Sequence, residues 1–82
     1  MEIKKLLTIY ITNTFIEDNH IKISTTDDIL STGIIDSLGM MKLIAYIEKK
    51  FNIKVLSKDI TFDNFVSIEK ISEYINYNQL IN

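Results

Sequence analysis

The sequence of 82 residues contains no cysteine, proline, tryptophan or arginine, and it has one histidine and two glycines. Without cysteine, disulfide bonds and thiolate metal sites are excluded. His20 alone cannot build a histidine metal site. Arginine is the usual reader of bases and phosphates, so its absence argues against nucleic-acid binding, although the middle of the chain is basic. We therefore expect no metal and no nucleic-acid partner.

The chain also lacks long apolar runs. None approaches the roughly 18 apolar residues that a membrane span needs, and no small-residue cleavage site follows the first apolar stretch, so we expect neither a membrane segment nor a signal peptide. With 46% hydrophobic and 24% charged residues, the composition is that of a globular protein. We expect one soluble, cytoplasmic domain over residues 1–82, too small for a deep catalytic cleft.

Charge is distributed unevenly along the chain. Residues 1–36 carry three lysines and six acids, residues 37–58 carry five lysines and one acid, and residues 59–82 carry one lysine and four acids. The corresponding net charges are −3, +4 and −3, which sum to the −2 of the whole chain. The central segment is therefore basic between two acidic ends.

Apolar residues recur every three or four positions in several segments, which predicts an all-α fold. The segment before the second long helix shows no such period and is rich in turn-forming residues, but its isoleucines and leucine predict that it packs on the core. Loops of this length in compact domains are usually functional or disordered. The expected elements are a first helix at about 2–17, a loop at 19–36, a second helix at about 37–51, a short helix at about 59–64 and a last helix at about 67–76, with a frayed end.

The predicted helix at 37–51 carries two apolar faces. One faces the core, and Leu38, Met41 and Ala45 lie on the opposite side, next to Lys42 and Lys49. A second apolar stripe on a helix either covers another part of the chain or contacts a partner. The stripe therefore covers the long loop, forms a small docking patch with a lysine rim, or does both in part.

Ser37 lies where the loop becomes this helix, a position that displays one hydroxyl for covalent modification. Serine and aspartate are also common helix caps, so Ser37 and Asp36 have an ordinary explanation. The neighbouring residues decide between the two interpretations.

Residues 32–39 (Thr-Gly-Ile-Ile-Asp-Ser-Leu-Gly) resemble the attachment motif of phosphopantetheine-bearing acyl, peptidyl and aminoacyl carrier proteins. The resemblance covers about residues 26–75, and the expected order of helices is also that of this family's four-helix bundle. Further matching positions are Leu43, Ile47, Phe51, Asn52, Ile53, Asp59, Ile60, Phe65, Ser67, Ile71, Tyr74 and Ile75.

The resemblance implies that Ser37 receives a 4′-phosphopantetheine arm from coenzyme A, transferred by a separate phosphopantetheinyl transferase with magnesium. The arm's thiol then carries a substrate as a thioester between partner enzymes. By the same resemblance, Asp36 assists the modification, and Leu38 and Met41 contact the transferase and the partners. Such a carrier is not itself an enzyme.

The charge of the second helix differs from that of one subclass of carriers, those of fatty acid synthesis. Carriers of dissociated fatty acid synthesis tend to be acidic there, whereas Gly39 and Lys42 take those places here. The sequence therefore favours a stand-alone, monomeric carrier that serves an adenylating or acyl-loading enzyme and a downstream synthase or transferase, in nonribosomal peptide-like or other specialised biosynthesis. The D-alanyl carriers are a similar type. A fatty acid carrier is the alternative.

Two other classes of function remain for comparison. The chain could be an unmodified helical interaction module, in which Ser37 only caps a helix. An enzyme would need an activated nucleophile, and the only histidine lies seventeen positions from Ser37. If the cargo is sequestered in the bundle, a gap is required near Leu43, Ile47 and Ile71.

Overall fold

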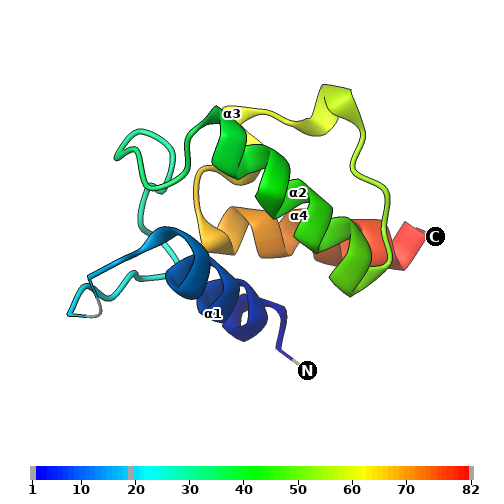
Figure 1. Ribbon diagram of the computed structural model, residues 1–82. Helices are drawn as coiled ribbons and strands as arrows, with labels where there is room; N and C mark the ends of the chain where they lie inside the picture. The colour runs from blue at the N-terminus through cyan, green and yellow to red at the C-terminus, as the bar shows by residue number, and fades with distance from the viewer. Residues whose placement is uncertain (1, 19, 82) are drawn as a thin grey trace.

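The computed structural model describes residues 2–18 and 20–81, which form helices and loops without any strand. The predicted all-α four-helix bundle is confirmed (Figure 1). Both ends of the expected domain, Met1 and Asn82, and the first loop residue, Asn19, lie outside the described residues. The helices are α1 (Ile3–Phe15), α2 (Ser37–Phe51), the 3₁₀ turn η1 (Ser57–Asp59), α3 (Phe62–Phe65) and α4 (Ile68–Ile81).

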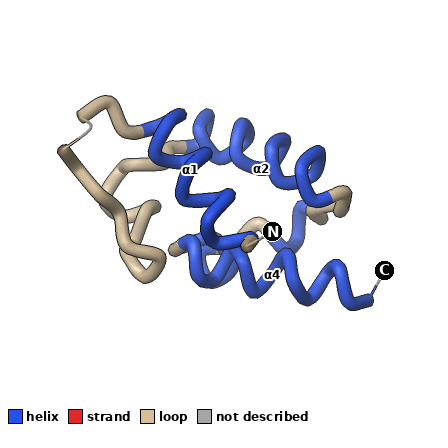
Figure 2. Tube along the Cα trace, turned by 90° about the horizontal axis from the view of Figure 1, so that it is seen from below, coloured by secondary structure: helices blue, strands red, loops and turns tan. Residues whose placement is uncertain are grey.

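The three long helices meet in one apolar core, with α2 and α4 on either side of α1 in the view of Figure 2. Each helix contributes side chains spaced three or four residues apart, as the apolar pattern predicts. Burying one such aliphatic side chain contributes about 1.5–3 kcal/mol. The fully buried core side chains on the helices are Leu7, Ile11, Leu43, Ile47, Phe65, Ile68, Ile71 and Ile75.

Aromatic stacking joins α1 to α2. The rings of Tyr10 and Tyr46 lie parallel, with centroids 3.9 Å apart, and the Tyr10 hydroxyl donates to the carbonyl of Lys42 at 3.3 Å. Burial, with a smaller contribution from Tyr10, raises the pKa of Tyr46 above its ordinary value. The inner side of α2 is thereby fixed against α1, whereas Leu38 and Met41 on its opposite side are exposed.

The long loop packs on the core, as its apolar residues predict. Ile29 and Ile35 are buried. The Ile29 amide donates to the Val66 carbonyl at 2.9 Å, and the Glu69 amide donates to the Thr25 carbonyl at 2.9 Å. The loop is therefore held by backbone hydrogen bonds to the α3–α4 junction before it reaches α2.

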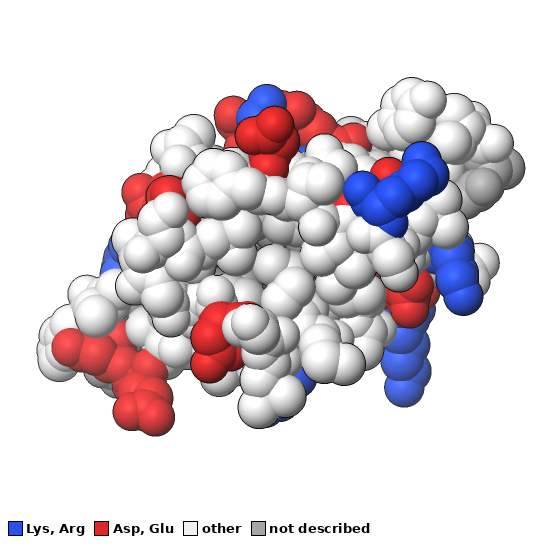
Figure 3. All heavy atoms as spheres, turned by 90° about the horizontal axis from the view of Figure 1, so that it is seen from above, with Lys and Arg blue, Asp and Glu red and all other residues white. Residues whose placement is uncertain are grey.

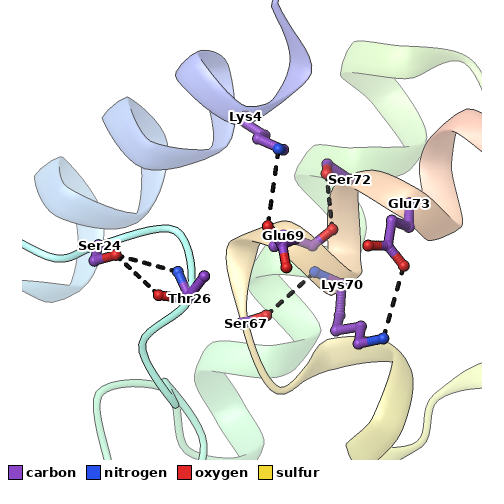
Figure 4. A network of polar contacts seen from close by, with 8 residues as sticks. All are labelled: Lys4, Ser24, Thr26, Ser67, Glu69, Lys70, Ser72 and Glu73. Atoms are coloured by element: carbon purple, nitrogen blue, oxygen red, sulfur yellow. Dashed lines mark hydrogen bonds and ion pairs between the residues drawn. The ribbon is translucent and has the colours of Figure 1, made fainter.

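A polar network surrounds the start of α4 (Figure 4). The Ser67 hydroxyl accepts from the Lys70 amide at 3.2 Å, and the Ser72 hydroxyl donates to the Glu69 carbonyl at 2.8 Å. Lys4 of α1 approaches the Glu69 carboxylate at 4.0 Å. Since this ion pair is partly exposed, it contributes little stability, and the backbone hydrogen bonds do more to hold the junction.

The expected boundaries of the first and short helices need correction. α1 ends at Phe15, earlier than expected, because Ile16 adopts an extended backbone with φ −113°. The short helix expected at about 59–64 is replaced by η1 followed by α3. Ile60 and Thr61 separate the two, and the Thr61 hydroxyl caps α3 by accepting from the Asn64 amide at 3.2 Å.

The last helix is longer than predicted, since α4 continues to Ile81 instead of ending near residue 76. The polar residues of this segment predicted a frayed end, and this prediction is wrong. Packing has already nucleated the helix, and each further residue then adds one backbone hydrogen bond. The Asn78 side chain also donates to the Tyr74 carbonyl, one turn earlier, at 2.9 Å.

Candidate functional site

Ser37 is the first residue of α2, and its side chain is exposed. The N-cap is Asp36, whose Oδ1 accepts from the Gly39 amide at 2.7 Å. In the part of the chain that the structure describes, Ser37 Oγ makes no hydrogen bond. The capping role that would explain Ser37 without modification thus belongs to Asp36, and the serine hydroxyl is free at the N-terminus of a fifteen-residue helix.

Gly39 allows the first turn of α2 to pack closely. A Cβ atom at this buried position would lie 2.9 Å from Phe15 Cε1 and 3.2 Å from Asp36 Oδ1, closer than van der Waals contact allows. The missing side chain lets the Phe15 ring and the capping carboxylate both approach the helix. The position of Ser37, two residues earlier, is therefore set by packing as well as by the cap.

An open groove of about 620 Å³ lies beside Ser37. It runs between the end of the long loop, the first turn of α2 and the segment that joins η1 to α3. Asp36 is the only charged residue among those that line it. The lining residues are Leu30, Gly33, Ile35, Asp36, Ser37, Met40, Ile60, Thr61 and Phe62.

The far wall of this groove is held by a hydrogen bond to α4. The Tyr74 hydroxyl donates to Asp59 Oδ2 at 2.8 Å. Burial raises the pKa of Tyr74, and the hydrogen bond and charge of Asp59 raise it further. Since Asp59 directly precedes Ile60, this bond positions the wall residues opposite Ser37.

The outer side of α2 faces solvent. Leu38 and Met41 are 65% and 70% exposed, so the interpretation in which they cover the long loop is wrong. Ala45, Lys42 and Lys49 are also exposed. We call these five residues the outer stripe; their spacing places them on one side of the helix, starting right after Ser37.

Two further acidic residues lie in the long loop before Ser37. The carboxylates of Asp27 and Asp28 hold turns of the loop: Asp27 accepts from the Ser24 amide at 2.8 Å, and Asp28 accepts from the Ser31 amide at 2.8 Å. The latter bond is the main cause that lowers the pKa of Asp28. No group of acids or histidine suited to a metal ion occurs within residues 2–18 and 20–81.

The gap near Leu43, Ile47 and Ile71 that a sequestered cargo would require is not open here, since all three side chains are completely buried. The groove lies instead at the end of the bundle. Thr61 and Phe62 are wall residues that the sequence did not predict. The only signal was the apolar Phe62 in a segment too short to bury it.

Comparison with known protein families identifies the family of this chain. Residues 9–75 match the family described as "Phosphopantetheine attachment site", which is most of the chain. The chain belongs to this family. It is a carrier-type protein, and the predicted cofactor, covalently attached 4′-phosphopantetheine, is confirmed by the membership. Proteins of this family work with a phosphopantetheinyl transferase and with loading or synthase enzymes.

Three similar proteins are D-alanyl carrier proteins of Streptococcus pyogenes, from serotype M5 (strain Manfredo), serotype M49 (strain NZ131) and serotype M1. Each is 38% identical over 45 residues, which is 55% of this chain. The match spans 57% of the length of these relatives. As for membranes, no helix among the described residues has the length and apolar character to cross one.

Proposed function

We propose that this protein carries an acyl, aminoacyl or peptidyl intermediate as a thioester on a 4′-phosphopantetheine arm attached to Ser37, and shuttles it between partner enzymes. The observation that carries the proposal is the free, exposed hydroxyl of Ser37 beside a cap supplied by Asp36. When bound, the arm supplies the thiol that this cysteine-free chain lacks. The chain itself catalyses no reaction in this proposal.

The start of α2 fits such an arm. A phosphodiester on Ser37 is an anion at a helix N-terminus, where the helix dipole favours negative charge by about 0.3–1 kcal/mol. The groove beside Ser37 leaves room on that side. In the transfer, Ser37 Oγ gives its proton to a base and bonds to the phosphorus that bears the pantetheine arm. The pyrophosphate bond of coenzyme A breaks, and adenosine 3′,5′-bisphosphate departs.

Asp36 is proposed to assist this modification. Its Oδ1 is engaged by the Gly39 amide, and within the described residues Oδ2 has no partner. The side chain is exposed, so a magnesium ion held by the transferase can approach that oxygen. One carboxylate would thus cap the helix and help position the metal of the partner enzyme.

The outer stripe is proposed to contact the transferase, the loading enzyme and the downstream enzyme. Leu38 and Met41 present apolar area next to the modified serine, and Lys42, Ala45 and Lys49 continue the contact along the helix. Exposed apolar side chains gathered on one face mark interaction sites.

An aminoacyl or peptide-like pathway, with an adenylating loading enzyme, fits best. The relatives described above are D-alanyl carrier proteins, which supports an aminoacyl cargo. A role in fatty acid synthesis is disfavoured, because partners built for an acidic helix would repel a helix with Lys42, Lys49 and Lys50.

The test is the intact mass of the protein after incubation with coenzyme A, magnesium and a broad-specificity phosphopantetheinyl transferase. We expect a gain of one phosphopantetheine mass in the wild type and none in Ser37→Ala. Ser31→Ala is the matched control, since Ser31 is another exposed serine near the groove, and it should be modified normally. Failure of the folded wild type to gain mass would favour an unmodified interaction module.

A further inference from the structure

The two lysines of the outer stripe are not neutralised by the chain itself. Lys42 and Lys49 are exposed, and no carboxylate lies within 4.0 Å of either in the described residues. The only acid of α2 is Glu48, and its Oε2 accepts from the Val55 amide at 2.9 Å. This carboxylate therefore anchors the chain after the helix and leaves the stripe positive.

The rest of the molecule has the opposite charge. Residues 37–58 sum to +4 and the remaining residues to −6, although the whole chain is only −2. In Figure 3, most lysines lie at the right-hand edge, whereas most acids lie at the left, at the top and below the centre, around a largely uncharged middle. Such an asymmetric charge distribution orients the protein as it approaches a charged partner.

The stripe also fixes where the charges lie relative to the modified serine. Apolar Leu38 and Met41 come first. Lys42 follows about 7.5 Å along the helix from Ser37, and Lys49 lies about 10 Å farther, at 1.5 Å per residue. A partner surface complementary to the stripe would therefore be apolar opposite Leu38 and Met41, next to Ser37, and negative opposite Lys42 and Lys49, farther along the helix.

We propose that the outer stripe docks on partner enzymes whose docking face is acidic, with carboxylates about 10 Å apart opposite Lys42 and Lys49. This inference rests on the proposed carrier function and adds the chemistry of the partner. Partners with a basic docking face are rejected, because like charges slow encounter and penalise the bound state. The net negative charge of the chain conceals this preference, since the docking side has the opposite sign.

The test uses two phosphopantetheinyl transferases, chosen because the surface around the active site is acidic in one and basic in the other. Initial rates give kcat/KM for the wild type, for Lys42→Glu/Lys49→Glu and for the control Lys5→Glu/Lys22→Glu. Both double variants change the net charge by the same amount, and Lys5 and Lys22 are exposed outside the stripe. For each of the three proteins, kcat/KM with the acidic transferase is divided by kcat/KM with the basic one. Comparing this ratio among the proteins removes the difference in intrinsic activity between the two transferases.

Reversing the stripe lysines should shift this ratio about tenfold or more towards the basic transferase, and raising NaCl from about 20 to 300 mM should largely remove the shift. The control should shift it less than about twofold. Equal shifts in both double variants, or no shift in either, would overturn the proposal. A failure of the carrier function itself would be distinct, because neither transferase would then modify the folded wild type even at the end of the reaction.

Discussion

Removing the cap at Asp36 should destabilise the protein, whereas removing the hydroxyl of Ser37 should not. The Asp36 carboxylate accepts the Gly39 amide at 2.7 Å, and Ser37 Oγ makes no hydrogen bond within the described residues. Replacing an N-cap aspartate with alanine costs about 1 kcal/mol. For a domain of this size that corresponds to a fall in Tm of about 4–8 °C. Ser37→Ala should change the free energy of unfolding by less than about 0.5 kcal/mol.

The assay is thermal and urea unfolding followed by the helical circular dichroism signal. It compares the wild type with Ser37→Ala, Asp36→Ala and Asp36→Asn. Asparagine caps helices about as well as aspartate, so Asp36→Asn should keep most of the stability. If Ser37→Ala is destabilised as much as Asp36→Ala, the hydroxyl is a cap, and the argument that leaves it free for modification is refuted.

The same variants separate two roles of the carboxylate. Asp36→Asn retains the cap but loses the charge that we propose helps to position magnesium. It should therefore unfold like the wild type and accept phosphopantetheine more slowly. An unchanged rate of transfer would limit Asp36 to capping.

Three further outcomes are expected. Tyr74→Phe removes the hydroxyl that donates to Asp59 at 2.8 Å, so urea unfolding should show a loss of about 1.5 kcal/mol, and an unchanged midpoint would contradict the role of this bond. Ile47→Ala should lower the free energy of unfolding by about 2–5 kcal/mol, because this side chain is completely buried. Met41→Ala, at a 70% exposed position, should lower it by less than about 0.5 kcal/mol. Similar losses in the two variants would refute the assigned faces of α2. The lowered pKa of Asp28 means that its ionised form stabilises the fold above pH 3.8, and that this stabilisation is lost as the pH falls through the lowered pKa. The wild type should therefore be more stable than Asp28→Asn at neutral pH and approach the stability of the variant in acid. A difference that stays constant with pH would contradict this.

Local patterns in the sequence predict the long helices well. The apolar spacing and the flanking Asp36 predict the observed range of α2. The Asp36 side chain also caps the helix, as is typical of aspartate at this position. The end of this helix is equally local: Asn52 adopts the left-handed conformation, with φ 54°, which asparagine tolerates. These features depend on residues within a few positions of one another, so the sequence alone carries them.

Features that join distant segments were predicted poorly. The groove beside Ser37 has a wall that includes Ile60 and Phe62, more than twenty positions later, and the bond between Asp59 and Tyr74 holds that wall. The length of α4 was also missed, since polar residues near its end give a weak local signal. Each of these outcomes depends on which surfaces meet in the folded chain.

The sequence by itself determined the all-α class, the capped start of α2 and the presence of two apolar faces on that helix, because periodicity and capping are properties of neighbouring residues. Only the tertiary structure decided which face stays in water. α1 packs on the inner side through Tyr10 and Tyr46, and the long loop is held at the α3–α4 junction, away from the outer side. Leu38 and Met41 therefore remain uncovered next to Ser37, since a helical pattern identifies its faces but long-range packing chooses the one that is buried.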